Sequence, residues 1–163
     1  MLVKSRFIIL LVVAALALIL SGCAGINVNT VAPVDNETVV IPVQFIDGIE
    51  VGPLYNMSVN VPQDWVGKFQ SRNVGNKVYF DYITPSGNTA PIFFIEALSP
   101  SQYWDQNGAH PTSYVNLINR GDTFFVYYLP IDAYYSGLPK QEFEAFAAAV
   151  PGIVSSFAAE AAN

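Results

Sequence analysis

The chain has 163 residues, of which 7 are basic and 13 acidic, so its formal net charge is −6. This length and an apolar content of 52% are enough for one domain with its own core. No basic cluster follows residue 6, which argues against nucleic-acid binding and against electrostatic attachment to anionic lipid. A single Cys and a single His exclude an internal disulfide and a zinc site built from those residues. No cofactor or metal is expected.

The first 22 residues have the pattern of a secretory signal. Lys4 and Arg6 precede an apolar run of fourteen residues, 7–20. As a helix this run extends about 21 Å, whereas the hydrocarbon core of a bilayer is about 30 Å thick. A basic start, a short apolar core and small residues before a cleavage point are typical of a signal peptide. We therefore expect residues 1–22 to be removed.

Leu20-Ser21-Gly22-Cys23 resembles the lipobox of bacterial lipoproteins. The resemblance implies diacylglycerol in thioether linkage on Cys23, cleavage after Gly22, and often acylation of the new amino group by a fatty acid such as palmitate. Two or more acyl chains anchor a protein stably. The expected location is the extracytoplasmic face of a cell membrane, and whether this is an inner or an outer membrane is left open.

Residues 23–38 are predicted to form the lipidated cysteine and a flexible tether, because they show no strand or helix periodicity. Residues 39–163 are predicted to form one globular domain. Pro42 restricts the first strand of this domain to a sheet edge or to an irregular arm. Asn73-Val74-Gly75-Asn76 predicts a hairpin turn with Gly75 at positive φ. The predicted strands are 39–46, 55–61, 68–72, 77–83, 91–98, 113–119 and 123–129.

Two further patterns concern the middle of the chain. The segments 91–98 and 123–129 are apolar on both faces, which predicts central strands covered on both sides. The segment 99–108 predicts a short helix, with Ser99 as N-cap and Pro100 in the first helical position.

The last segment has the clearest periodicity. Its apolar residues form one helical stripe interrupted only by Pro151, which predicts one kinked helix. The stripe comprises Phe143, Phe146, Ala147, Val150, Ile153, Val154 and Phe157. The predicted fold is therefore α+β, an antiparallel sheet of about five or six strands with a C-terminal amphipathic helix packed on one face.

Two short motifs, at residues 59–65 and 153–157, resemble Mog1/PsbP-like domains. Val59-Asn60-Val61-Pro62-Gln63-Asp64-Trp65 is similar to the opening strand, Pro and Trp of that family, and Ile153-Val154-Ser155-Ser156-Phe157 to its closing helix. Together they span roughly residues 55–160. The resemblance implies an α/β/α sandwich and carries no activity, because members bind different partners.

Chemistry-bearing residues are few. His110, the one histidine, has no Gly-x-Ser-x-Gly nucleophile motif to serve. Asp105, Asp122 and Asp132 fall near predicted strand ends or in loops, where a carboxylate pair could hydrolyse an envelope polymer. Their spacing favours no particular pair, so no catalytic residue is predicted.

Aromatic residues are the remaining signal. Tyr103, Trp104, Tyr134 and Tyr135 lie in predicted loops beside polar residues, where rings can stack on sugars or anchor a protein partner. The alternative is that these rings cap a small core. We predict a non-enzymatic binding or accessory role, with an envelope-polymer hydrolase and a structural subunit of a membrane complex as the alternatives.

Overall fold

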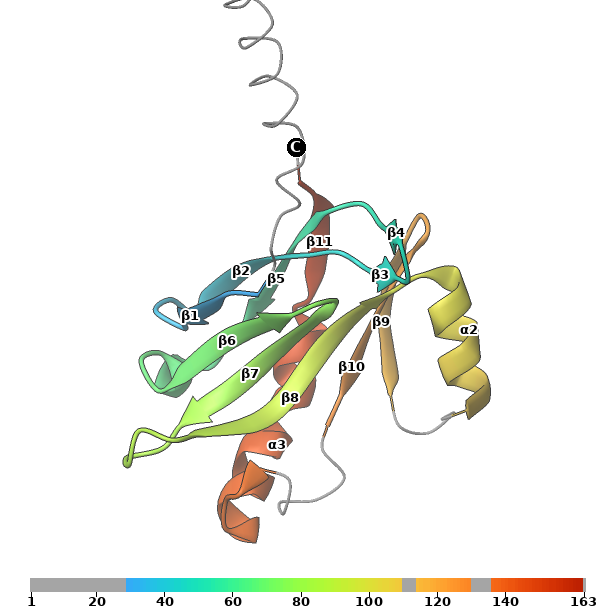
Figure 1. Cartoon of the computed structure of the whole chain (residues 1–163). Helices are drawn as coiled ribbons and strands as arrows, with labels where there is room; N and C mark the ends of the chain where they lie inside the picture. Colours follow the sequence, from blue (N-terminus) through green and yellow to red (C-terminus); the bar gives the residue numbers. More distant parts are fainter. Residues whose placement is uncertain (1–28, 110–113, 130–135, 163) are drawn as a thin grey trace, which may run out of the picture.

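A computed structural model describes residues 29–109, 114–129 and 136–162. Its main element is a six-stranded antiparallel sheet in the order β1-β6-β7-β8-β10-β9 (Figure 1). The strands of this large sheet are β1 (Val31–Pro33), β6 (Phe69–Val74), β7 (Lys77–Ile83), β8 (Thr89–Leu98), β9 (Val115–Arg120) and β10 (Thr123–Tyr128).

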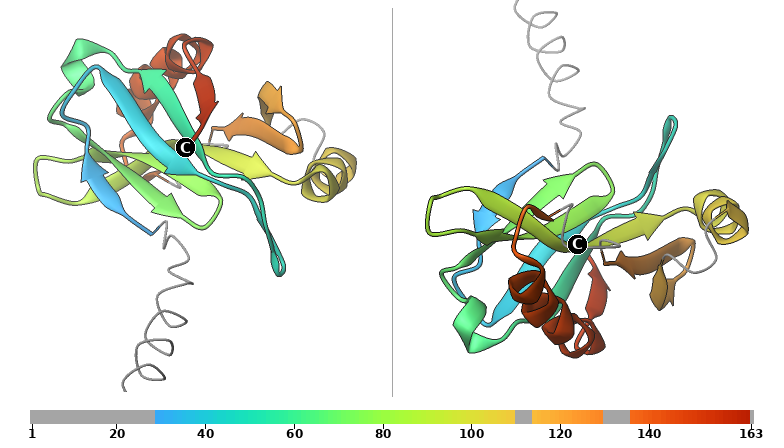
Figure 2. Two further views of the ribbon diagram at one scale, coloured as in Figure 1. Left: turned by 90° about the horizontal axis from the view of Figure 1, so that it is seen from above. Right: turned by 90° about the horizontal axis from the view of Figure 1, so that it is seen from below.

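A smaller three-stranded sheet, in the order β11-β5-β2, packs across one face of the large sheet together with the helix α3 (Figures 1 and 2). The helix α2 packs on β8 and β10. The remaining elements are β2 (Thr38–Val43), β3 (Ile46–Asp47), β4 (Glu50–Val51), β5 (Tyr55–Asn60), the 3-10 turn η1 (Gln63–Trp65), α2 (Pro100–Ala109), α3 (Lys140–Ser155) and β11 (Ala158–Ala161). The predicted fold class, an antiparallel sheet with a C-terminal helix on one face, is confirmed.

The core lies between the inner face of the large sheet, the small sheet and α3. From the large sheet it contains Phe69, Val78, Phe80, Phe93 and Ile95, all fully buried. The predicted stripe of α3 contributes buried Phe143, Val150, Ile153 and Val154. Phe146 and Phe157 are only partly buried against this core. Apolar burial on this scale is the main stabilising term of a domain.

Several local predictions are confirmed. Gly75 forms the β6–β7 turn with φ of 62°. The Ser99 hydroxyl accepts a hydrogen bond of 3.1 Å from the backbone N–H of Gln102, which is the geometry of an N-cap. β2 pairs only with β5 within the described residues, so the strand that contains Pro42 is an edge strand. The α3 helix continues through Pro151 to Ser155.

The tether prediction is wrong for the part of it that the structure describes. Val31–Pro33 forms β1, which pairs with β6, and Val34 is completely buried. The sequence offered no periodicity here because three residues are too few to show one. Residues 23–28 lie outside the described residues. The closing helix also ends earlier than the apolar stripe, and Ala158–Ala161 forms a strand that no pattern predicted.

A short hairpin, β3–β4, projects from the body of the domain (Figure 2). Its base is held to α2, because the Ser99 hydroxyl donates to the Asp47 carboxylate at 2.6 Å and the side-chain Nε2 of Gln102 donates to the Ile46 carbonyl at 2.7 Å. Within the described residues no helix is long and apolar enough to cross a membrane.

Candidate binding surface

The face of the large sheet that points away from the core carries a line of large side chains. In a sheet, residues directly opposite one another on neighbouring strands point to the same face. The pairing registers place five such residues in one line across β1, β6, β7, β8 and β10, namely Val31, Arg72, Tyr79, Phe94 and Tyr128. We call this line the outer-face row.

The rings of the outer-face row cover each other's faces. The guanidinium of Arg72 lies 4.2 Å from the ring centroid of Tyr79. The rings of Tyr79 and Phe94 are 5.1 Å apart, and those of Phe94 and Tyr128 are 4.6 Å apart with an angle of 15° between their planes. The rings therefore stand side by side on the sheet and present mainly their edges to solvent.

Two ion pairs lie on the same face, one made by Arg72 of the row and one beside the row, and in each pair the acid is more buried than the base. Arg72 Nε donates to Asp81 at 2.9 Å, and Lys77 Nζ lies 3.6 Å from Glu96. The side chains of Arg72 and Lys77 are 33% and 35% exposed, whereas those of Asp81 and Glu96 are 1% and 5% exposed. The more exposed member of each pair is therefore the basic one, although the whole chain is acidic.

Hydrogen bonding and burial change the pKa values of three groups on this face. The hydrogen bond to Asp81 raises the pKa of Arg72. Burial raises the pKa of Glu96, and the charge of Lys77 and the amide of Asn76 offset part of this rise. Burial, together with the Glu96 carboxylate, also raises the pKa of Tyr128 well above its usual range, so its phenol stays protonated and donates to Gln106.

Glu96→Gln is expected to raise stability at neutral and higher pH. The folded protein holds a proton on Glu96 up to a higher pH than the unfolded chain, so the wild-type free energy of unfolding falls as the pH rises above the ordinary value of 4.5. Glutamine removes this dependence while keeping an oxygen for Asn76. Urea unfolding at about pH 4 and about pH 8 measures the free energy of unfolding of the wild type and of Glu96→Gln. A variant less stable than wild type at the higher pH would show that the Lys77 pair outweighs the cost of burial.

The structure describes two of the four predicted binding residues, and these two differ in exposure. Tyr103 is 8% exposed, stacks on Phe124 at 4.2 Å and accepts a hydrogen bond from the Asn116 amide at 2.7 Å. Tyr103 therefore belongs to a small core under α2, and the prediction of an exposed recognition ring is wrong for it. Trp104 is 62% exposed, with its ring centroid 5.1 Å from that of Tyr103. Tyr134, Tyr135 and Cys23 lie outside the described residues.

An aromatic chain joins Trp104 to the outer-face row. Tyr114, just before β9, has its ring centroid 5.7 Å from that of Tyr128 and 6.1 Å from that of Tyr103. Tyr103 in turn contacts Trp104 edge to face. Ring contacts thus run from the row through the small core under α2 to the exposed Trp104.

Among the described residues, the two buried acids, Asp81 and Glu96, do not form a carboxylate pair. Asp105 on α2 and Asp122 in the β9–β10 turn are exposed, and His110 and Asp132 are outside those residues. The buried acids are well separated, because Glu96 stands opposite Lys77 and Asp81 lies four residues further along β7, roughly 13 Å away. Glycosidase carboxylates lie about 5–10 Å apart. The described residues also contain no cluster of three or more acids, His or Cys placed to hold a metal ion.

Sequence reasoning missed Arg72, Tyr79, Phe94 and Tyr128 as candidates for a shared surface. Each was assigned to a strand, but which residue stands opposite which depends on the pairing register. The sequence feature that could have indicated this surface is the presence of two basic residues, Arg72 and Lys77, in strands rich in aromatic residues. No family model matches the chain, and neither a curated protein nor a solved structure matches it.

Proposed function

We propose that this protein is a lipid-anchored binding protein on the extracytoplasmic face of a cell membrane, with no catalytic activity of its own. The anchor rests on the fourteen-residue apolar run and on Leu20-Ser21-Gly22-Cys23. Removal of residues 1–22 would leave a mature chain with a net charge of about −8. Such a domain has little attraction to anionic lipid, so the acyl chains alone would hold it at the membrane.

Cys23→Ala is expected to release the protein from membranes or to leave residues 1–22 attached. The reason is that the thioether can form only on a thiol, and this chain has no other cysteine. Fractionation of cells that express either form measures the change, with Ser21→Ala as the matched control because alanine is also small. A Cys23→Ala protein that is processed and stays with the membrane would contradict the proposed anchor.

The binding role is carried by one observation, the outer-face row with Trp104 at the α2 end. Tyr, Trp and Arg are the residues that most often dominate binding energy at protein interfaces. A protein partner is favoured over a glycan because the ring faces of Phe94 and Tyr128 cover each other, and a sugar stacks on ring faces. Among the described aromatic residues only Trp104 is more than half exposed.

Photo-cross-linking from position 104 tests this surface. A benzoylphenylalanine in place of Trp104 should form an adduct with a partner in intact membranes, and one in place of Glu144 should not. Glu144 is the matched control, because its side chain is 61% exposed but lies on α3. With the partner purified, Trp104→Ala should weaken binding by about 2 kcal/mol, roughly thirtyfold.

Two results would contradict a binding role for this surface. The first is a yield of cross-linked adduct from position 104 that does not exceed the yield from position 144. The second is a Trp104→Ala protein whose affinity for the identified partner equals that of wild type. Thermal unfolding of Trp104→Ala distinguishes lost contact from lost structure, because an exposed side chain contributes little to stability.

A further inference from the structure

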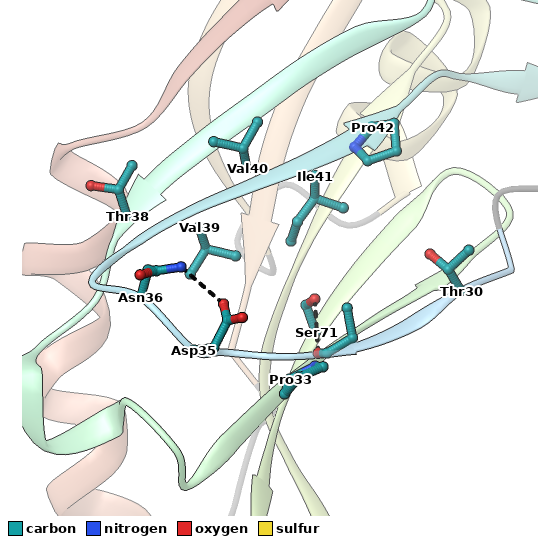
Figure 3. Close-up of a pocket in the computed structure, with 11 residues that line it drawn as sticks. Thr30, Pro33, Asp35, Asn36, Thr38, Val39, Val40, Ile41, Pro42 and Ser71 are labelled. Atoms are coloured by element: carbon teal, nitrogen blue, oxygen red, sulfur yellow. Dashed lines mark hydrogen bonds between the residues drawn. The ribbon is translucent and has the colours of Figure 1, made fainter.

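A groove separates the first strands of the two sheets. β1 and β2 are each at the edge of their sheet within the described residues, and they diverge from the corner formed by residues 34–37 (Figure 3). The groove has a volume of about 400 Å³ and is lined by five consecutive residues of β2, 38–42, and by residues of β1 and β6. It lies on a different part of the domain from the α2 end that carries Trp104.

The edge of β2 that faces this groove has backbone N–H and C=O groups without hydrogen-bond partners among the described residues. The Val61 amide donates to the Glu37 carbonyl, so odd-numbered residues of β2 bond to β5 and even-numbered residues point the other way. Thr38 and Val40 therefore direct one N–H and one C=O each into the groove. No described residue accepts or donates a bond to these groups.

Both ends of this open edge are defined. At one end the chain turns through residues 34–37, where the Val34 amide donates to the Phe69 carbonyl at 2.9 Å. At the other end the Asn73 amide reaches across and donates to the Pro42 carbonyl at 2.6 Å. Pro42 has no N–H, so pairing cannot continue beyond it. The open edge from residue 38 to residue 42 is roughly 13 Å long, the length of an extended segment of about four or five residues.

The groove lining combines apolar side chains of β2 with uncharged polar residues, and an acid lies at the corner. Val39 and Ile41 are 8% and 5% exposed, and Ile41 points between the two strands (Figure 3). Asp35 lines the corner end, Glu37 lines the adjoining hollow, and neither lining contains a basic residue. A segment bound here would need an apolar side chain over Val39 and Ile41 and a positive charge near Asp35.

We propose that this groove binds an extended peptide segment, which adds to β2 as a fourth strand of the small sheet. Its backbone pairs with Thr38 and Val40, its inward side chain is apolar, and a Lys, Arg or amino terminus lies beside Asp35. Strand addition to an open sheet edge takes its affinity from main-chain hydrogen bonds and its specificity from alternate side chains.

The test uses the full-length protein in detergent micelles and a displayed library of random heptapeptides. Selected peptides should alternate apolar and polar residues and carry a basic residue at one end. In hydrogen exchange, a synthetic copy of a selected peptide should slow exchange at the Thr38 and Val40 amides. Val40→Pro should weaken binding about tenfold, because it removes an outward N–H. The matched Val40→Ala should bind within about twofold of wild type, because alanine keeps that N–H.

A second variant tests the role of the Asp35 charge. Hydrogen exchange on the wild-type protein gives a result that does not depend on whether a variant folds. Asp35→Lys should weaken binding of a basic peptide, and replacing the peptide's Lys with Glu should restore it. Near-ultraviolet circular dichroism checks that Val40→Pro folds. If it does not fold, protection of the Thr38 and Val40 amides in the wild-type protein decides whether the peptide binds at this edge. The proposal is overturned if no peptide is selected, or if selected peptides leave the Thr38 and Val40 amides unprotected.

Discussion

Replacing Trp65 with alanine is expected to lower the free energy of unfolding by about 3–5 kcal/mol. The indole is 2% exposed and stacks on Phe69 at 3.8 Å with 3° between the ring planes. It also meets Phe146 of α3 edge to face at 5.9 Å. Loss of the ring would leave a cavity where η1, β6 and α3 meet. Denaturant unfolding monitored by far-ultraviolet circular dichroism measures the change.

Trp104→Ala is the matched control, because the chain has only these two tryptophans. Trp104 is 62% exposed, so its replacement should change stability by less than about 1 kcal/mol. Equal losses at the two positions would contradict the assignment of one tryptophan to the core and the other to the surface.

Arg72→Met is expected to cost about 2–3 kcal/mol, less than for a fully buried pair because Arg72 is one third exposed. The change leaves the Asp81 carboxylate, which is 1% exposed, without its main partner. Gln70 offers only a long hydrogen bond of 3.5 Å to the same carboxylate. Urea unfolding at neutral pH gives the size of the loss.

The double variant Arg72→Met with Asp81→Leu separates the cost of an unpaired charge from the cost of altered packing. Replacing both members of a buried pair by apolar residues is often close to neutral. The double variant should therefore be more stable than Arg72→Met alone. If its loss equals or exceeds that of the single variant, the packing of Arg72 on Tyr79 matters more than the charge of Asp81.

The sequence predicted those elements whose signal is local. The α3 stripe repeats over about four turns, and the β6–β7 hairpin has a Gly at the position that needs positive φ. Such patterns need no knowledge of distant partners.

Elements stabilised by distant partners were missed. β1 has three residues and exists through its pairing with β6, about forty residues away in the chain. β11 has the sequence Ala-Ala-Glu-Ala, which has low strand propensity, and it forms because the edge of β5 is available to it. In both cases tertiary pairing outweighs local preference.

The candidate surface depends on register in the same way. Alternation predicted that Tyr79 and Phe94 would each point to one face of a strand, but only the pairing of β7 with β8 places them together. Trp104 was found from its polar neighbours. Tyr103 beside it has the same neighbours and is buried, because α2 turns adjacent side chains in different directions.

The mass of the N-terminal peptide of the native protein, purified from membranes of the producing cells, tests the proposed lipid anchor most directly. A lipid-anchored protein must begin at Cys23 and carry the mass of a diacylglyceryl group on that residue, with or without a further acyl chain on its amino group. A mature protein with an unmodified Cys23, or one that retains residues 1–22, would contradict the proposed anchor.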